Sequence, residues 1–265
     1  MTQAQTAVPG SSADDEDAPP VLPVVEPPPP DPTRPPLPRE RPAEQTAALT
    51  NMVLRPVGAG VFEIGTVRLD QKARTVTFPA VVNARGGPME YLIVTPYGST
   101  HESVLRTEAE PYQIHIAMLL LGARGQTHSP GGANGELPPA SRIVDPWTRP
   151  ITGDRVGLEV AWDGDSGSRR CPAEQWVFNL ATGAPMSPGP WVYNGSLVHR
   201  GIFRAQVDGA VAALIGCPSA LVNNPRRGSD NDDVWTVNTN ALPAMGTAVT
   251  VTLRLEGSPP GPSEK

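Results

Sequence analysis

Two alternating segments give the clearest structural signal in this chain: Val61-Phe-Glu-Ile-Gly-Thr-Val-Arg-Leu69 and Arg74-Thr-Val-Thr-Phe-Pro-Ala-Val-Val82. Apolar side chains alternate with polar ones in both segments, which is the period of a strand that buries one face. The turn-forming residues Asp70-Gln-Lys-Ala73 separate the two segments. The sequence therefore predicts an antiparallel hairpin within a chain that is rich in β-sheet.

The same pattern continues along the chain, where short apolar segments are separated by Gly, Pro, Asn and Asp. Further strands are predicted at residues 89–95, 154–162, 174–178, 191–194, 203–207, 210–215, 234–237 and 248–255. Asp208-Gly209 stands between two of these segments. Because Asp-Gly suits the left-handed positions of a tight turn, we predict a hairpin there.

One segment predicts a helix: Pro111-Tyr-Gln-Ile-His-Ile-Ala-Met-Leu-Leu-Leu-Gly122. Pro111 suits a first helical turn, and Gly122 suits the position after the last one. Residues 114–121 are apolar on nearly every side, and a helix of that kind is expected to be buried all round. The predicted fold is therefore α+β and β-rich. Antiparallel sheets, in a sandwich-like arrangement, would pack around one buried apolar helix at about 110–122.

Composition divides the chain into one domain and two tails. Residues 1–48 hold 13 of the 33 prolines and three arginines against eight acidic residues, and they are predicted to be a disordered acidic tail. Residues 49–256 are predicted to form a single domain with a loop insertion at about 123–150, followed by a second disordered tail at 257–265. The first tail carries most of the formal net charge of −6, so the domain is almost neutral. Nucleic-acid binding is not expected without a basic face.

Neither an export signal nor a transmembrane segment is visible in the sequence. The residues after Met1 show no basic stretch followed by an apolar one, and no run of 18 uncharged apolar residues occurs. Cys171 and Cys217 fit no metal-binding spacing. Whether these two thiols pair would depend on the compartment of the protein.

The ionisable residues best suited to chemistry lie in the segment His101-Glu102-Ser103 and at His115 of the predicted helix. His101, Glu102 and His115 could together bind a divalent metal, although their spacing is not that of HExxH. His101 and Ser103 would face the same side of an extended chain, but no nucleophile elbow surrounds Ser103, and hydrolysis is not favoured. Alternatively, His115 is a neutral imidazole in the core, with Glu102 or Ser103 as its hydrogen-bond partner.

A second group of candidates combines aromatic and polar side chains in the manner of a ligand pocket: Trp191, Tyr193, Asn194 and Ser196. The alternative is an aromatic strand that packs on the helix. The run Asp230-Asn-Asp-Asp233 offers oxygen ligands of the kind that calcium prefers, but it lacks the EF-hand pattern. A solvated acidic loop is therefore expected there.

Several segments of the chain resemble the YdjY-domain family of bacterial proteins. They are Gly65-x-Val-x-Leu-Asp70, Thr77-Phe-Pro-Ala-Val-Val-Asn83, Glu90-Tyr-Leu92, His101-Glu102-Ser103, His115-Ile-Ala-Met-Leu-Leu-Leu-Gly122, Trp191-x-Tyr-x-Gly195-Ser196 and Gly209-x-Val-x-Ala-Leu214. No one of these motifs is specific, and the resemblance rests on their order and spacing.

The resemblance implies a protein of the periplasm or cell envelope, or a secreted one, without a known biochemical role. A cytoplasmic location is the alternative, because no leader is visible. Some family members are described as ferredoxin-like, but an iron–sulfur cluster needs about four thiolate or imidazole ligands and is not expected here. We therefore predict a non-enzymatic binding or interaction domain with a His/Glu/Ser-lined site and a protein or small-molecule partner. The alternative is a metal-binding protein or metalloenzyme that uses His101, Glu102 and His115.

Overall fold

The computed structural model of the protein describes residues 53–84, 86–126, 150–164 and 167–257. All of them belong to one compact unit, Leu37–Lys265. The other unit, Met1–Pro36, lies outside the described residues. So do the predicted tail at 1–48, most of the predicted insertion at 123–150 and nearly all of the predicted tail at 257–265. These three assignments remain predictions.

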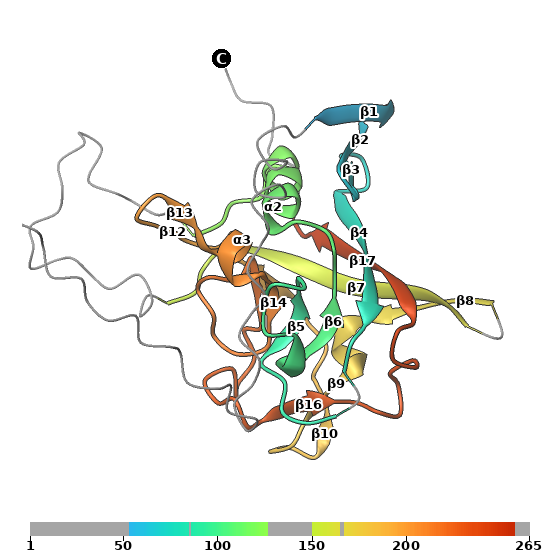
Figure 1. Ribbon diagram of the computed structural model, residues 1–265, viewed down its shortest axis with the longest axis vertical. Helices are drawn as coiled ribbons and strands as arrows, with labels where there is room; N and C mark the ends of the chain where they lie inside the picture. The colour runs from blue at the N-terminus through green and yellow to red at the C-terminus, as the bar shows by residue number, and fades with distance from the viewer. Residues whose placement is uncertain (1–52, 85, 127–149, 165–166, 258–265) are drawn as a thin grey trace, which may run out of the picture. The chain divides into compact units, whose positions relative to one another are not determined.

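Eight strands of the main sheet close into a barrel. In order around it they are β4 (Thr75–Val82), β17 (Ala248–Leu255), β7 (Asp154–Gly164), β11 (Trp191–Tyr193), β15 (Val222–Asn223), β14 (Ala210–Ala213), β5 (Tyr91–Val94) and β6 (Ser103–Arg106). The pairing of β6 with β4 closes the circle (Figure 1). Two of the pairs, β5–β6 and β14–β15, are parallel.

The predicted architecture, antiparallel sheets packed in a sandwich around a buried helix, is therefore wrong. A closed barrel buries one face of each strand against the other strands, so its core needs no central helix. Alternate residues of the longest strands face inward, among them Val76 and Phe78 of β4 and Val251 and Leu253 of β17. The alternation was predicted correctly, but it is equally compatible with a sandwich and with a barrel.

Three strands extend the sheet beyond β4: β1 (Leu54–Gly58), β2 (Val61–Ile64) and β3 (Val67–Asp70). The predicted long strand is split between β2 and β3 at Gly65, which has a φ of +59°. A Cβ atom at this position would lie 2.5 Å from Nε2 of Gln113. The left-handed backbone favours glycine at this turn, whereas the Gln113 amide is the end of a flexible side chain that could move aside.

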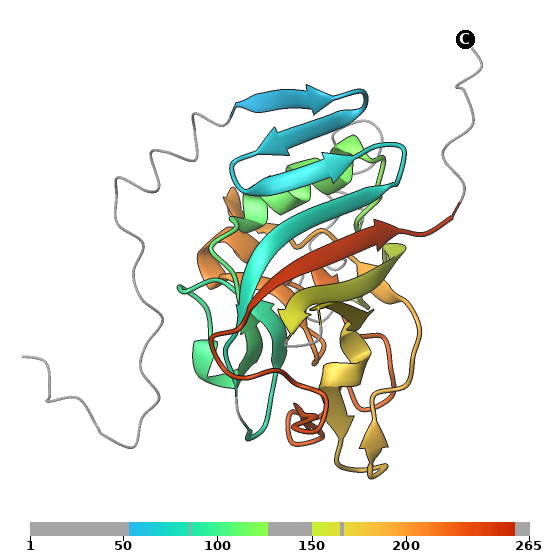
Figure 2. The same cartoon turned by 90° about the vertical axis from the view of Figure 1, so that its right-hand side faces the viewer.

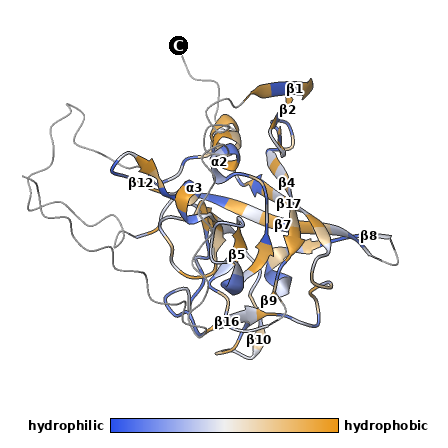
Figure 3. Cartoon of the chain, viewed as in Figure 1, coloured by the Kyte–Doolittle hydropathy of each residue, from blue (hydrophilic) through white to orange (hydrophobic). Residues whose placement is uncertain are grey.

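The helix α2 (Pro111–Leu120) begins at the predicted proline and packs against β3 and β4. Ile114, Ala117 and Met118 are buried on this side, whereas Leu119 and Leu120 are 49% and 43% exposed. The prediction of a helix buried all round is therefore wrong. Figure 2 shows α2 directly behind β3 and β4, and the colours of Figure 3 show hydrophobic residues along much of the helix. Only one side of α2 therefore packs against the sheet.

The remaining elements are short. They are β8 (Gly167–Pro172), which pairs with β7, the small sheet β10 (Ala184–Pro185), β9 (Val177–Asn179) and β16 (Trp235–Val237), the hairpin β12 (Val198–His199) and β13 (Ile202–Phe203), the 3-10 turns η2 (Thr100–Glu102) and η5 (Ala173–Trp176), and the helix α3 (Arg204–Asp208). The hairpin predicted at Asp208-Gly209 is wrong, because Gly209, with a φ of +65°, instead ends α3. A glycine in the left-handed conformation can end a helix or form the turn of a hairpin. Among the described helices, none has the length and apolar character needed to span a membrane.

Candidate functional site

His101 and Glu102, two of the predicted site residues, lie in η2 at the surface. Nε2 of His101 is 3.3 Å from Oε1 of Glu102, and the two side chains are 37% and 33% exposed. A solvated pair of this kind stabilises a fold little, because water screens the charges. Ser103 follows in β6 but is fully buried, and its hydroxyl donates a hydrogen bond of 2.8 Å to the Leu105 carbonyl. The Ser103 proton is thus engaged within its own strand.

His115 is held by contacts between α2 and the barrel. Its Nδ1 shares a hydrogen bond of 2.7 Å with the hydroxyl of Tyr193 in β11, and its ring lies 4.9 Å from that of Phe203. Burial lowers the pKa of His115 to about 4, so the imidazole is neutral at physiological pH. Burial, with the nearby Asp154 charge, raises the pKa of Tyr193. The hydrogen bond therefore joins two neutral groups and ties the helix to the barrel wall.

The strand β6 lies between the two histidines along the chain. The turn η2, which contains His101, immediately precedes this strand, whereas α2, which carries His115, follows it. A four-residue strand spans about 13 Å. Within the described ranges, no group of three or more His, Cys, Asp or Glu side chains could hold a metal ion. His115 bonds Tyr193, whereas His101 lies beside Glu102, and the metal hypothesis that combines the three residues remains a prediction.

The remaining predicted residues are buried and hydrogen-bonded inside the protein. Trp191 Nε1 donates to Glu174 Oε1 over 3.1 Å, Asn194 Nδ2 donates to the Pro218 carbonyl over 3.1 Å, and Ser196 Oγ donates to the Ser219 carbonyl over 2.7 Å. Asn194 Oδ1 also accepts a hydrogen bond of 2.7 Å from Asn223 Nδ2. In the structure these side chains bond protein atoms, as buried polar groups generally do.

Glu174 and Arg226 form a buried ion pair next to Trp191 of β11. We call these three residues the Glu174 network. Arg226 Nη2 donates to Glu174 Oε1 over 2.9 Å, and the guanidinium carbon lies 5.2 Å from the centre of the Trp191 ring. The Glu174 and Arg226 side chains are only 5% and 10% exposed. Burial lowers the pKa of Arg226, and the charge of Glu174 partly offsets this effect. The other carboxylate oxygen, Glu174 Oε2, is buried and has no hydrogen-bond partner in the described part of the chain.

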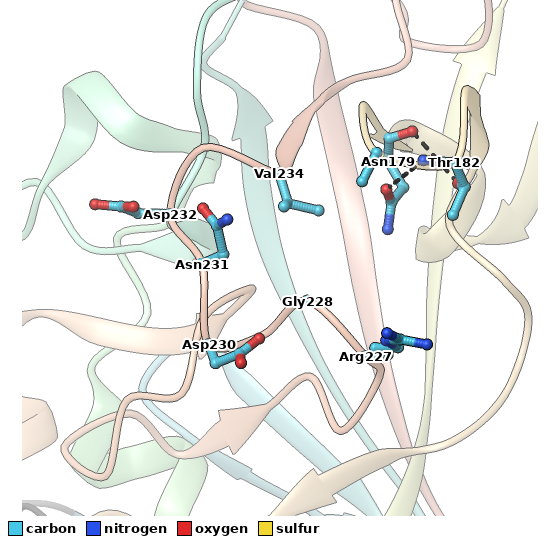
Figure 4. A pocket seen from close by; sticks show the side chains of 9 residues that line it. Asn179, Thr182, Arg227, Gly228, Asp230, Asn231, Asp232 and Val234 are labelled. Atoms are coloured by element: carbon cyan, nitrogen blue, oxygen red, sulfur yellow. Dashed lines mark hydrogen bonds between the residues drawn. The ribbon is translucent and has the colours of Figure 1, made fainter.

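A cleft of about 630 Å³ opens where the loop before β16 faces the turn after β9. We call it the polar cleft, after the side chains that line it: Asn179, Thr182, Arg227, Asp230, Asn231 and Asp232. Figure 4 shows Asp230 and Arg227 on opposite sides of the opening. The described residues provide no hydrogen-bond or ion-pair partner for either of these two charges. The acidic run expected to be a solvated loop thus forms one wall of this cleft.

Comparison with known proteins supplies the family. The family model of the YdjY domain matches residues 67–254 of the chain. The chain belongs to the YdjY-domain family. No curated protein and no solved structure gives a significant match. The resemblance predicted from the sequence is therefore confirmed.

The matched YdjY domain runs from β3 to β17, and it contains both the Glu174 network and the polar cleft. Sequence reasoning missed Glu174 and Asn179 as site residues and passed over Arg226. These three residues belong to the candidate sites because of their burial and of contacts with residues that are distant in the sequence. The one available signal was Arg226-Arg227, two adjacent cations in a chain without a basic face.

Proposed function

We propose that this YdjY domain is a non-enzymatic binding domain of the bacterial cell envelope, and that the polar cleft holds its ligand. A binding role is supported by the hydrogen bonds of the residues that could have carried out catalysis, because these bonds engage their reactive groups. The Ser103 hydroxyl bonds its own strand, and His115 is a neutral imidazole paired with Tyr193. The envelope location is supported by membership of the YdjY-domain family, which implies a periplasmic, cell-envelope or secreted protein.

The observation that carries the proposal is the pair of opposite charges across the polar cleft, which have no partner among the described residues. Its volume of about 630 Å³ lies in the range of about 300–1,000 Å³ that is typical of small-molecule sites. Arg227 offers a planar set of donors that suits a carboxylate, and Asp230 offers acceptors that suit an ammonium or another N–H donor. Asn179 lines the same cleft beside Thr182, and its Oδ1 accepts the Thr182 N–H over 3.0 Å. The cleft therefore suits a small zwitterionic ligand.

The test uses the dipeptide alanyl-alanine, which has both a free ammonium and a free carboxylate. We expect it to shift the amide resonances of Asn179, Arg227 and Asp230 in a ¹H–¹⁵N NMR titration, with an affinity in the millimolar range because the charges are solvated. Its N-acetylated, C-amidated form lacks both charges and is expected to cause no such shifts. Arg227→Gln and Asp230→Asn should each weaken binding about tenfold.

Arg169→Gln serves as the matched control, because Arg169 is an exposed arginine of β8 that does not line the cleft. The control is expected to bind like the natural chain. Equal binding of the charged and the capped dipeptides, or no shift at these residues, would refute the cleft as a zwitterion site. The envelope location is tested separately by fractionation of cells that express the protein, and recovery in the cytoplasmic fraction would refute it.

A further inference from the structure

The side of α2 that faces away from the sheet is apolar and exposed. On this side Tyr112, Leu119 and Leu120 are 39%, 49% and 43% exposed, and Ile116 is half-buried. The four residues stand at i, i+4, i+7 and i+8, which places them in one stripe along a helix. We call them the outer stripe. A stripe of this kind normally packs against a neighbour, but the sheet lies on the opposite side of α2.

The hairpin β12–β13 and the helix α3, which lie beside α2 in Figure 1, widen this apolar surface. Phe203 of β13 packs edge-on against Tyr112, with the ring centroids 5.6 Å apart. Val198 pairs with Phe203 across the hairpin, so the two side chains share a face, and Val198 is 56% exposed. Val207 of α3 is 55% exposed and follows Gln206, whose side chain accepts a hydrogen bond from the Tyr112 N–H. We call the outer stripe, Val198, Phe203 and Val207 the apolar face.

The two ends of α2 carry opposite charges, whereas the helix itself carries none. No Asp, Glu, Lys or Arg occurs at residues 111–123, and His115 is neutral at physiological pH. Glu108 and Glu110 precede the helix, and Arg124 follows it. When a second copy of α2 crosses the first in the opposite direction, the acidic end of each helix meets the basic end of the other. The two helix dipoles also favour that direction.

The size of the apolar face suits a weak dimer. A standard interface buries about 800 Å² on each partner, and the exposed parts of the apolar side chains supply roughly half of that area. Specific interfaces of this small size are weak and reversible. The domain is almost neutral, so two copies do not repel each other at long range.

We infer that the apolar face joins two copies of this chain in a symmetric dimer, in which the two α2 helices cross in opposite directions. With the two-fold axis close to Ile116, Tyr112 of one copy meets Leu120 of the partner subunit, because each stands four residues from Ile116. A second copy presents the same uncharged stripe and the complementary helix ends. The inference is independent of the polar cleft, which lies at β9 and the loop before β16.

The test is sedimentation equilibrium of the full chain across micromolar concentrations. We expect a reversible monomer–dimer equilibrium with a Kd of about 10–100 µM, in keeping with the small area. Leu119→Glu should raise the Kd at least about tenfold, because it places a charge in the apolar face. Leu180→Glu is the matched control, since Leu180 is 55% exposed and follows β9, far from α2 in Figure 1. This control should keep the Kd of the natural chain.

Charge reversal tests the direction in which the helices cross. Glu108→Arg and Arg124→Glu should each raise the Kd about fivefold, because like charges then meet at the helix ends. The double variant again places opposite charges together, so its Kd should return to within about twofold of that of the natural chain. Parallel helices would not show this rescue, because each end would then meet its own copy.

The inference is overturned if the natural chain is monomeric at every concentration, or if Leu119→Glu and Leu180→Glu change the Kd equally. It is also overturned if the double variant associates no better than the two single variants. A monomeric natural chain that Leu119→Glu destabilises towards urea, and Leu180→Glu does not, would show instead that another part of the same chain covers α2.

Discussion

Acidification is expected to destabilise the domain through His115. Burial lowers the pKa of this imidazole to about 4, whereas a histidine in an unfolded chain has a pKa of about 6.5. Between these two values the unfolded chain binds a proton that the folded domain does not bind. The free energy of unfolding therefore falls as the pH falls. The contribution is fully present above about pH 6.5 and is lost progressively towards pH 4.

The size of this effect follows from the two pKa values. Linkage gives a loss of about 2.5 kcal/mol in the free energy of unfolding between pH 7.5 and pH 4.5. Because the His115 side chain is only partly buried, a loss of about 2 kcal/mol is the more realistic expectation. This is a large share of the stability of an ordinary domain, which is about 5–15 kcal/mol.

The assay is urea denaturation of the natural chain and of His115→Gln at both pH values. Glutamine is chosen because its amide oxygen can accept a hydrogen bond from Tyr193, which is the neighbour of His115 in the fold. Carboxylates also titrate in this range, so the informative quantity is the difference between the two proteins. We expect the natural chain to lose about 2 kcal/mol more than the variant on acidification.

His101→Gln is the control, since it removes a surface imidazole and leaves His115 in place. It is expected to lose as much stability as the natural chain. If His115→Gln and the natural chain lose equal stability between pH 7.5 and pH 4.5, the argument from the burial of His115 fails.

Two further predictions concern packing, and urea denaturation measures both. Arg226→Met should destabilise the domain by about 3–5 kcal/mol, because it leaves the charge of Glu174 buried without its partner, whereas Arg170→Met removes only an exposed pair and should cost less than about 1 kcal/mol. A small cost for Arg226→Met would contradict the buried pair. Ile114→Ala should cost about 2–5 kcal/mol and Leu119→Ala about 0.5 kcal/mol, because only the first residue is buried. Equal costs would mean that α2 is enclosed on both sides.

Elements whose formation depends on residues close together in the chain could be predicted from the sequence. The hairpin of β3 and β4 follows from an alternation that is visible in the chain, and the start of α2 follows from Pro111. The sequence could not show which side of α2 is buried. The helix is apolar on nearly every side, and only the fold determines which side packs against the sheet. Asp208-Gly209 shows the same limit, since one backbone conformation ends a helix or turns a hairpin.

The site was harder to predict than the fold. Glu174 is 17 residues from Trp191 and 52 residues from Arg226, so no spacing rule relates the three side chains. His101 and His115 are close in sequence, yet the strand β6 and the start of α2 lie between them in the chain. An extended strand separates its ends by about 3.3 Å per residue, so closeness in the chain does not by itself bring two side chains together.

The amino-acid sequence by itself determined the family, the predominance of strands and the near-neutral charge of the domain, since each is a property of composition or of local order. Only the tertiary structure decided that the sheet closes on itself, through pairings such as β4 with β6 and β14 with β15. It also brings His115 to Tyr193 and leaves one oxygen of Glu174 without a hydrogen-bond partner in the described ranges. These features depend on strand partners and register, which are set by the burial of the whole barrel core and cannot be read from any one segment.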